Sequence, residues 1–483
     1  MKKEFGVLCH ISSLVSNYGV GDFGRSSFEF IDFLAKQKID IWQVLPLTET
    51  NEYNCPYGSM CYFAFDTMFI DPEDLVERGL ISRLDEVRAR CELSPKVDYA
   101  KVKKIKLELL DIAYKNITKD YKKKLASFQR KNIEILDYAL YKGVMEFNQQ
   151  RTDIDVNNLT LGNAIINFDY VIENPDIITK TVFFQYLLSE QWAKVKAYAK
   201  KKGVKILGDM PIYPSPKSFD VFNNAICFKL DKKGNPLVYG GVPADDFCDN
   251  GQNWGSCIYD WDYLKKNNYN FIVQKVKKLL KNYDILRLDH YLGYVEHYEI
   301  DAKNPKVGTW VQEGGEDFFS TLKKNISLKK VVIEDLGICR SEPERVKKLF
   351  NLKGMRVLQF AWHNESEHLP KNIDKNCIFY LGTHDNNTFI GFLESLSKEK
   401  RAEFLKLMEI EDASNQEVLV SCVQKMIESR SDTVVLQIQD LLMQDASARM
   451  NVPGRAEGCW DYRLPKDYQE RVNQNLKLMM NKK

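Results

Sequence analysis

A chain of 483 residues can bury a large core, and its 44% hydrophobic content is typical of a globular protein. The near balance of 69 Lys+Arg against 67 Asp+Glu leaves a formal charge of +2, which argues against nucleic acid as a partner. The N-terminus has a short basic start but no long apolar run, so we expect no signal peptide, transmembrane span or membrane partner.

The eleven cysteines are scattered and contain no CxxC pair, which favours free thiols in a reducing cytoplasm. The six histidines form no HExxH motif and no Cys/His cluster. We therefore expect no metal site, and nothing in the sequence implies an organic cofactor. The oligomeric state is left open at this stage.

Short apolar runs, rich in branched residues and bounded by Gly, Pro, Asp or His, recur along the chain. Such runs are typical of strands that are buried on both faces of a parallel sheet. Helical patterns fall between them, at 26–38, 181–200, 345–350 and 416–429. The alternation predicts an α/β fold, a (β/α)8 TIM barrel, with a doubly wound open sheet as the alternative. The predicted strands are 5–11, 41–47, 204–208, 285–288, 331–333, 356–360, 377–381 and 433–438.

Two connections are too long for a plain barrel unit of roughly 30 residues. The stretch at about 80–175 is Lys-rich and helical, so we expect an inserted helical subdomain there. The stretch at about 212–270 is rich in Gly, Pro, Asn and aromatic residues, which is typical of loops that form a cleft. We therefore divide the chain into the start of the barrel with a substrate loop (1–79), the insertion (80–175) and the remainder of the barrel (176–483).

Three acidic residues, Asp289, Glu334 and Asp385, come directly after predicted strands. One such acid alone is more often a helix N-cap, but the carboxyl ends of barrel strands share one face, so these three should converge. Converging carboxylates predict retaining glycosyl chemistry, with the two reacting groups about 5–5.5 Å apart. Arg287 should face the same side as Asp289 and keep it ionised, whereas Asp335 should face away and be structural.

Many ordered motifs along the chain point to one family. They are GVGDFG (19–24), WQVLPL (42–47), CPYGS (55–59), GDMPIY (208–213), GVPADDF (241–247), GQNWG (251–255), RLDHYLGY (287–294), IEDLG (333–337), GMRVLQFAW (354–362), GTHDNNT (382–388) and ARMNVPG (448–454). On these motifs the chain resembles the 4-α-glucanotransferases of glycoside hydrolase family 77, also called amylomaltases or disproportionating enzymes, which are related to the α-amylases. The helical stretch at about 80–175 carries no such motif.

The resemblance implies transfer of α-1,4-glucan segments from a donor maltooligosaccharide to an acceptor glucose or glucan. It implies Asp289 as the nucleophile, Glu334 as the general acid/base and Asp385 as the stabiliser of the transition state. Aromatic rings suit such substrates because the C–H faces of glucose are apolar. The positions that match substrate contacts in the family are Tyr57, Asp209, Gln252, Trp254, Arg287, His290 and His384.

The sequence leaves three alternative functions. A dinucleotide-dependent oxidoreductase is disfavoured because seven residues separate Ile11 from the GxGxxG pattern at 19–24, which should directly follow its strand. A glucan-binding protein without catalysis is disfavoured because all three carboxylates are present. A hydrolase of the same fold differs only in whether water or a sugar intercepts the glycosyl-enzyme, and the sequence leaves that choice to the resemblance.

Overall fold

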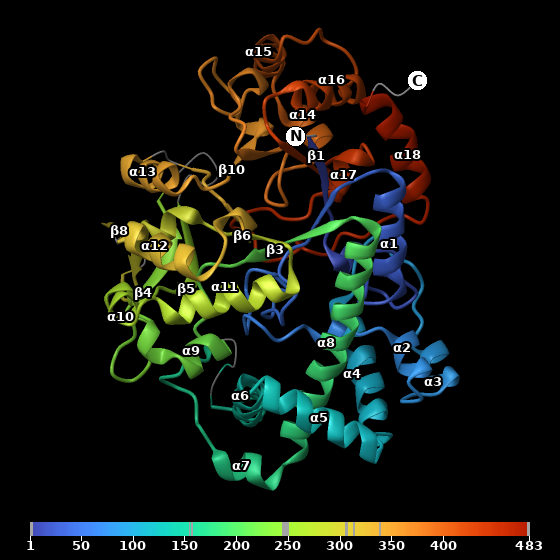
Figure 1. The fold of residues 1–483 in the computed structure, drawn as a ribbon, viewed down its shortest axis with the longest axis vertical. Helices are drawn as coiled ribbons and strands as arrows, with labels where there is room; N and C mark the ends of the chain where they lie inside the picture. The colour runs from blue at the N-terminus through green and yellow to red at the C-terminus, as the bar shows by residue number, and fades with distance from the viewer. Residues whose placement is uncertain are drawn as a thin grey trace.

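The protein is built around a closed barrel of parallel strands (Figure 1). The computed structural model describes residues 3–153, 155, 158–243, 251–304, 308–312, 314–337 and 340–480. All the predicted strands are confirmed, and they lie side by side in the order β10-β11-β12-β1-β2-β3-β6-β9. Their bounds are β1 (Glu4–Leu8), β2 (Ile41–Gln43), β3 (Lys205–Met210), β6 (Ile285–Leu288), β9 (Val331–Ile333), β10 (Gly354–Val357), β11 (Cys377–Tyr380) and β12 (Thr433–Gln437).

The two ends of this sheet meet, so it is a barrel and not an open sheet. Val332 of β9 forms a parallel bridge with Lys353, and the Ile333 amide donates to the Lys353 carbonyl at 2.8 Å. Residues of β11 and β12 are all buried, as expected of strands covered on both faces.

Three strands end at least three residues sooner than the sequence predicts. β1 stops at Leu8, β2 at Gln43 and β10 at Val357, and short 3₁₀ turns, Ile11–Ser13 and Leu358–Phe360, follow β1 and β10. Apolar residues continue past the last ladder pair in all three cases because the mouth of the barrel is itself packed, so hydrophobicity alone cannot locate the strand end.

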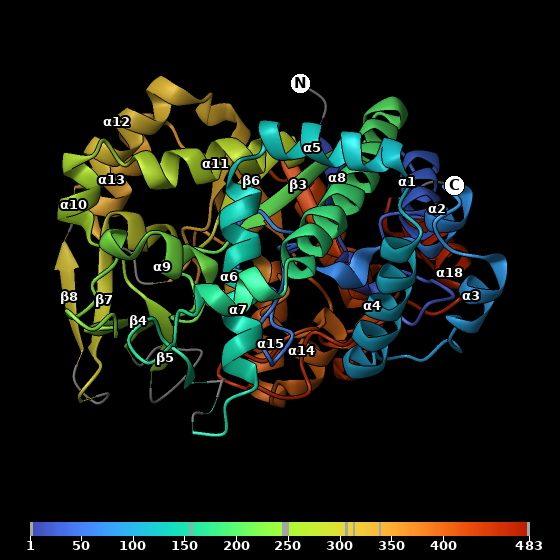
Figure 2. The same cartoon turned by 90° about the horizontal axis from the view of Figure 1, so that it is seen from below.

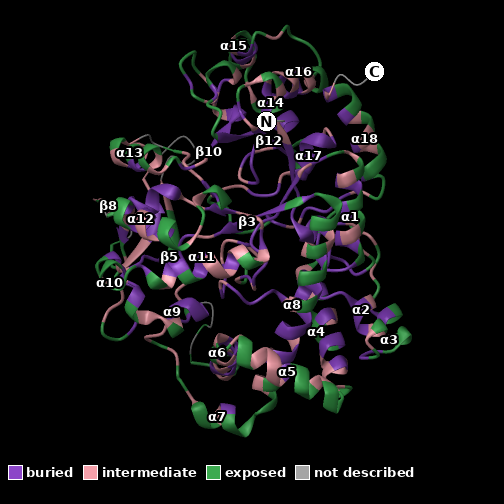
Figure 3. Cartoon of the chain, in the orientation of Figure 1, coloured by how far each residue is buried: buried purple, intermediate pink, exposed green. Residues whose placement is uncertain are grey.

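Helices surround the barrel, and their buried sides face the strands (Figure 3). The helix predicted at 26–38 is confirmed as α1, which buries Phe30, Phe33 and Leu34. The long α8 ends at Gly203, whose φ of 79° permits the left-handed turn that closes a helix. No helix in the described part of the chain has the length and apolar character needed to cross a bilayer. The helices outside the stretch at 80–175 are α1 (Arg25–Lys36), α2 (Pro72–Glu77), α8 (Asp176–Lys202), α9 (Phe219–Asn223), α10 (Trp261–Lys266), α11 (Asn270–Asn282), α12 (Gly315–Asn325), α13 (Ser341–Phe350), α14 (Phe389–Ser395), α15 (Lys398–Met408), α16 (Asn415–Glu428), α17 (Ile438–Leu441) and α18 (Tyr468–Met479).

A second group of helices lies at one end of the molecule, beyond the barrel strands (Figures 1 and 2). α4, α5 and α6 of this group pack against α8, whose C-terminal end leads into β3. The Lys-rich run at 119–124 lies at the start of α5 with its lysines exposed, as a solvated helix face should. These helices are α3 (Arg83–Arg88), α4 (Tyr99–Lys115), α5 (Lys119–Lys131), α6 (Glu134–Gln149) and α7 (Phe168–Glu173).

A four-stranded antiparallel sheet stands beside the barrel, and the sequence did not predict it. Its order is β5-β4-β7-β8, so the stretch expected to form cleft loops contributes two strands, and the region after β6 contributes the other two. Residues 244–247 of the GVPADDF motif lie outside the described residues. The strands are β4 (Val238–Val242), β5 (Gln252–Cys257), β7 (Glu296–Asp301) and β8 (Gly308–Gln312).

Candidate active site

The three predicted carboxylates lie at one mouth of the barrel. Asp289 follows β6, Glu334 follows β9, and Asp385 lies beyond β11. These strands are parallel, so their carboxyl ends open on the same face. The side chains of Asp289 and Asp385 are partly exposed, so a ligand can reach them.

Arg287 links two acidic residues of the site. Its Nη1 lies 2.7 Å from Oδ2 of Asp209 on β3 and 3.0 Å from Oδ1 of Asp289. The Tyr57 hydroxyl donates to the same Oδ2 at 2.8 Å. The predicted orientation of Arg287 toward Asp289 is therefore confirmed, and the guanidinium fixes Asp289 relative to the floor of the barrel.

Glu334 is held by backbone amides of two neighbouring loops. The His290 amide donates to Oε2 at 2.9 Å, and the Leu336 amide donates to Oε1 at 3.1 Å. His290 has the left-handed backbone conformation, with φ 46° and ψ 62°, which is uncommon for a residue other than glycine. The residue that follows Asp289 thus contacts the Glu334 carboxylate directly.

Asp385 is held by residues that the sequence reasoning did not assign. The Asn451 amide nitrogen donates to Oδ1 at 2.6 Å, and Arg449 donates to the Asp385 carbonyl at 2.8 Å. His384 Nε2 lies 3.1 Å from Oδ2. Asn451 and Arg449 belong to the ARMNVPG motif, which follows the last barrel strand, and that position was the signal that could have found them.

Aromatic rings line two sides of the site. The Tyr57 ring stacks on His384 with centroids 5.0 Å apart and planes at 15°, and Trp460 packs against both rings at 5.9 Å. A second aromatic contact involves the residue after Asp289: the Trp254 ring packs edge-on against His290, with ring centroids 4.8 Å apart. Trp254 is 37% exposed, so its ring is available to a ligand.

Every site residue predicted from the sequence is therefore joined to the others through contacts. Gln252 is connected to the site through Trp254, whose Nε1 donates to the Gln252 Oε1 at 3.2 Å. Trp460 is an addition that sequence reasoning missed.

The environment separates the acidities of the three carboxyls. Burial, opposed in part by Arg287, raises the pKa of Asp289 to about 6. Burial together with the charge of Asp289 raises the pKa of Glu334 to about 8. For Asp385, burial is outweighed by His384 and Asn451, and the pKa falls to about 2. Near neutral pH, Glu334 therefore carries a proton while the two aspartates are ionised.

Asp335, next to Glu334, faces away from this site. Its carboxylate accepts from Lys347 at 2.6 Å and from Arg356 at 2.9 Å, and both contacts are largely buried. The predicted structural role is confirmed, although the side chain makes ion pairs and does not cap a helix.

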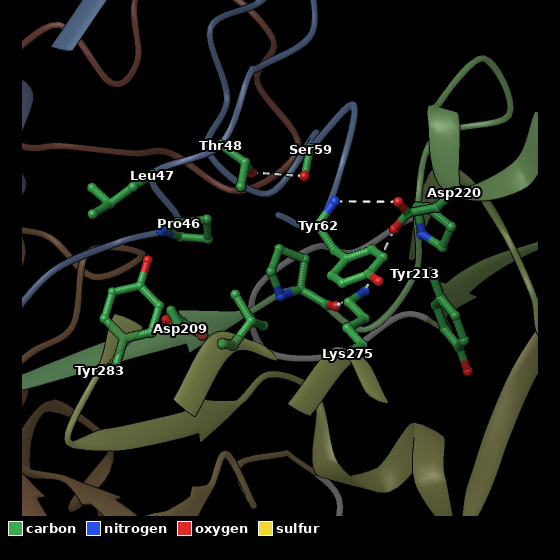
Figure 4. A pocket seen from close by; sticks show the side chains of 13 residues that line it. Pro46, Leu47, Thr48, Ser59, Tyr62, Asp209, Tyr213, Asp220, Lys275 and Tyr283 are labelled. Atoms are coloured by element: carbon green, nitrogen blue, oxygen red, sulfur yellow. Dashed lines mark hydrogen bonds and ion pairs between the residues drawn. The ribbon is translucent and has the colours of Figure 1, made fainter. Parts of the chain in front are cut away.

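A small cavity of about 10 Å³ lies beside Asp209, and residues that follow β2 and β3, among them Pro46 and Tyr213, line it (Figure 4). Lys275 and Asp220 face each other across it at 3.9 Å, and Lys275 Nζ also donates to the Pro211 carbonyl at 3.2 Å. The Tyr62 amide donates to Asp220 at 3.2 Å. These contacts attach the chain that follows Asp209 to α11 and to the segment of Tyr62.

A closed (β/α)8 barrel with carboxylates at the carboxyl ends of its strands defines the class, a TIM-barrel enzyme. The sequence profile of the 4-alpha-glucanotransferases matches residues 9–469. The chain is 34% identical to the 4-alpha-glucanotransferase of Aquifex aeolicus, with 96% of each chain covered, and 35% identical to that of Clostridium butyricum, with 94% and 95% covered. The solved amylomaltase of Streptococcus agalactiae, in complex with acarbose, superposes with a TM-score of 0.92 at 30% identity, covering 99% of each chain. The chain belongs to the 4-α-glucanotransferase family, glycoside hydrolase family 77.

Proposed function

We propose that the protein transfers α-1,4-glucan segments between maltooligosaccharides by a retaining double displacement. The observation that carries the proposal is the coupling of two carboxylates. Asp289 is fixed by Arg287 at 3.0 Å, and the amide of the next residue, His290, donates to Glu334 at 2.9 Å. A nucleophile and an acid/base must act on the same glycosidic bond, and this arrangement supports that.

The difference in acidity supports a role for each carboxyl. Asp289, with a pKa of about 6, is ionised near pH 7 and attacks the anomeric carbon of the donor. Glu334, with a pKa of about 8, is protonated there and gives its proton to the departing oxygen. After the covalent glycosyl-enzyme has formed, Glu334 takes a proton from the acceptor hydroxyl, and a new α-1,4 bond replaces the bond to Asp289.

Asp385 acts on the donor sugar ring as it flattens in the transition state of each step. Its pKa of about 2 keeps it negative throughout, which suits a group that stabilises positive charge on an oxocarbenium-like ring. The aromatic rings at Tyr57 and Trp254 offer faces against which pyranose rings stack, and Asp209, Gln252, His290 and His384 offer polar atoms for sugar hydroxyls.

Transfer and hydrolysis share the glycosyl-enzyme and differ in what intercepts it. Maltotriose incubated with the purified protein should give glucose together with a ladder of longer maltooligosaccharides, measured by chromatography. Glucose and maltose without longer products would indicate a hydrolase instead. An unchanged substrate after hours would indicate a glucan-binding protein without catalysis.

The proposal extends to the cellular location of the protein and to the division of its chain into an insertion and two barrel segments. The cysteines of the described residues are all free thiols, and such thiols support a cytoplasmic location because disulfides are rare there. Helices α4–α7 fall within 80–175, which supports treating that stretch as an insertion between barrel segments 1–79 and 176–483.

A further inference from the structure

The helical insertion contacts the segment that carries Tyr57, here named the Tyr57 loop (residues 48–62). The first contact is at Glu49. Lys142 of α6 lies 2.6 Å from its Oε1, and the hydroxyl of Tyr138, also on α6, donates to its Oε2 at 2.5 Å. Glu49 also bonds the other end of the loop, because its carbonyl accepts from the Met60 amide at 2.8 Å. α6 therefore holds the base of the loop.

A second contact holds the tip of the same loop. Lys103 of α4 donates to Oδ1 of Asn54 at 2.7 Å and lies 3.4 Å from the Thr50 hydroxyl. Asn54 has a left-handed backbone, with φ 55°, and it lies three residues before Tyr57. A side-chain contact at the turn that aims Tyr57 limits how far the ring can move.

The insertion also contacts the segment of Trp460, whose ring packs against the Tyr57–His384 stack, and these three rings are here named the Tyr57–His384 wall. The Tyr99 hydroxyl, at the start of α4, donates to the Trp460 carbonyl at 2.6 Å, and the Val97 amide donates to the Asp461 carbonyl at 2.7 Å. Trp460 is itself left-handed, with φ 68°. Both segments that flank the Tyr57–His384 stack are thus attached to α4 or to the residues just before it.

These contacts suit positioning better than overall stability. The side chains of Lys142 and Glu49 are 35% and 30% exposed, and ion pairs that water reaches contribute little to the free energy of unfolding. A loop at the mouth of a barrel gains more, because ordering it before the ligand arrives removes an entropic cost from binding.

We propose that the helical insertion sets glucan affinity, with Lys103 and Lys142 as positioning residues that hold Tyr57 in place to stack on a sugar ring. The inference rests on the sugar-contacting role of Tyr57 in the proposed function. The ligand class is a maltooligosaccharide long enough to lie along the Tyr57–His384 wall. The glycosyl chemistry itself stays with the carboxylates across the site.

The test measures the Kd of maltoheptaose by calorimetry in a Glu334→Gln background, where turnover is blocked. The double substitution Lys103→Met/Lys142→Met should raise this Kd roughly threefold to tenfold, because the loop must then be ordered on binding. In the otherwise native enzyme, KM for maltotriose should rise by a similar factor, with kcat changed less than about twofold. Glu49→Gln, which keeps an acceptor for Tyr138, is the milder second variant if the double variant folds poorly.

A matched control removes an ion pair that joins α4 to α8 and includes no residue of the Tyr57 loop. Lys180 of α8 lies 2.9 Å from Asp111 of α4, and both side chains are partly exposed. Lys180→Met should leave the Kd unchanged. In a Tyr57→Ala background the double substitution should also leave the Kd unchanged, because its effect passes through the Tyr57 ring.

Several outcomes would overturn the inference. One is an unchanged Kd in the double variant. A second is an equal rise in Lys180→Met, which would mean general loosening of the helices. A third is an undiminished rise in the Tyr57→Ala background, which would mean that the insertion acts elsewhere. Failure of the proposed function would look different, because the unaltered enzyme would then make no longer glucans from maltotriose whatever the Kd values are.

Discussion

The amide of His290 donates a hydrogen bond of 2.9 Å to Oε2 of Glu334. The bond joins the loop after β6 to the carboxylate after β9, and it depends on the left-handed backbone of His290. Asp289 directly precedes His290 in the chain. The bond therefore attaches the carboxylate of one reacting group of the proposed mechanism to the backbone beside the other.

Glu334→Gln should reduce kcat for maltotriose at least about 10²-fold, because the amide cannot deliver a proton to the leaving oxygen. An α-maltotriosyl fluoride donor needs no such proton for the first step, so its glycosylation rate should fall much less. Burst kinetics with the two donors separate these cases. Equal losses with both donors would contradict the acid role of Glu334.

Asp289→Ala should abolish transfer from either donor, since no covalent glycosyl-enzyme can form without the nucleophile. The fold should survive, because the side chain is 23% exposed and contacts the site, not the core. Circular dichroism and thermal unfolding check the fold, and product chromatography checks the activity. Turnover close to that of the unaltered enzyme would remove Asp289 from the proposed role.

The pH dependence of kcat/KM should be bell-shaped. Asp289 must be ionised and Glu334 protonated, so activity should fall below about pH 6 and above about pH 8, the raised pKa values of the pair. In Glu334→Gln the alkaline limb should disappear while the acid limb remains. A flat profile between pH 5 and 9 would show that these groups do not control the reaction.

The raised pKa of Glu334 also makes a prediction about stability. An unfolded glutamate has a pKa of about 4.3, so above that pH the unfolded state gains from ionisation that burial denies the native state until about pH 8. The native state is thus penalised progressively between these limits, and the penalty vanishes below the lower one. The Tm of Glu334→Gln relative to the unaltered protein should therefore rise from pH 5 to pH 8, measured by calorimetry. A difference that falls or stays constant over this range would contradict the assignment.

The barrel could be predicted from the sequence, whereas the antiparallel sheet could not. Barrel strands such as β12 are apolar on both faces, and that pattern is visible in a single chain. β4 and β5 have no such pattern because they carry glycines and polar residues. A Cβ on Gly241 would lie 2.2 Å from the Gln252 carbonyl oxygen, so close strand packing excludes the side chains that would have revealed a strand.

The site was predicted as far as its residues follow strands or match family motifs. The contacts that hold those residues were not, since they depend on backbone geometry and distant segments. The bond from His290 to Glu334 requires a positive φ at residue 290, and a histidine at that position does not predict one. The partner of Asp385 is Asn451, 66 residues further along the chain. Neither the barrel pattern nor the acidic residues point to such a pair.

Asn451→Ala tests whether the geometry of Asp385 matters for the transition state. Asn451 donates to Oδ1 at 2.6 Å and helps to hold the pKa of Asp385 at about 2. A hydrogen bond to a charged group is worth about 1.5–3 kcal/mol, so kcat should fall roughly 10- to 100-fold if the full bond acts in the transition state. KM for maltotriose should change much less, since the flattened ring, and not the bound ground state, needs the charge of Asp385. Steady-state kinetics with maltotriose give both constants.

Asn451→Asp is the informative companion, because it keeps the size of the side chain but places a second negative charge against Asp385. It should reduce kcat more than Asn451→Ala does at neutral pH. A kcat loss in Asn451→Ala that equals its KM change would instead indicate that Asn451 shapes substrate binding.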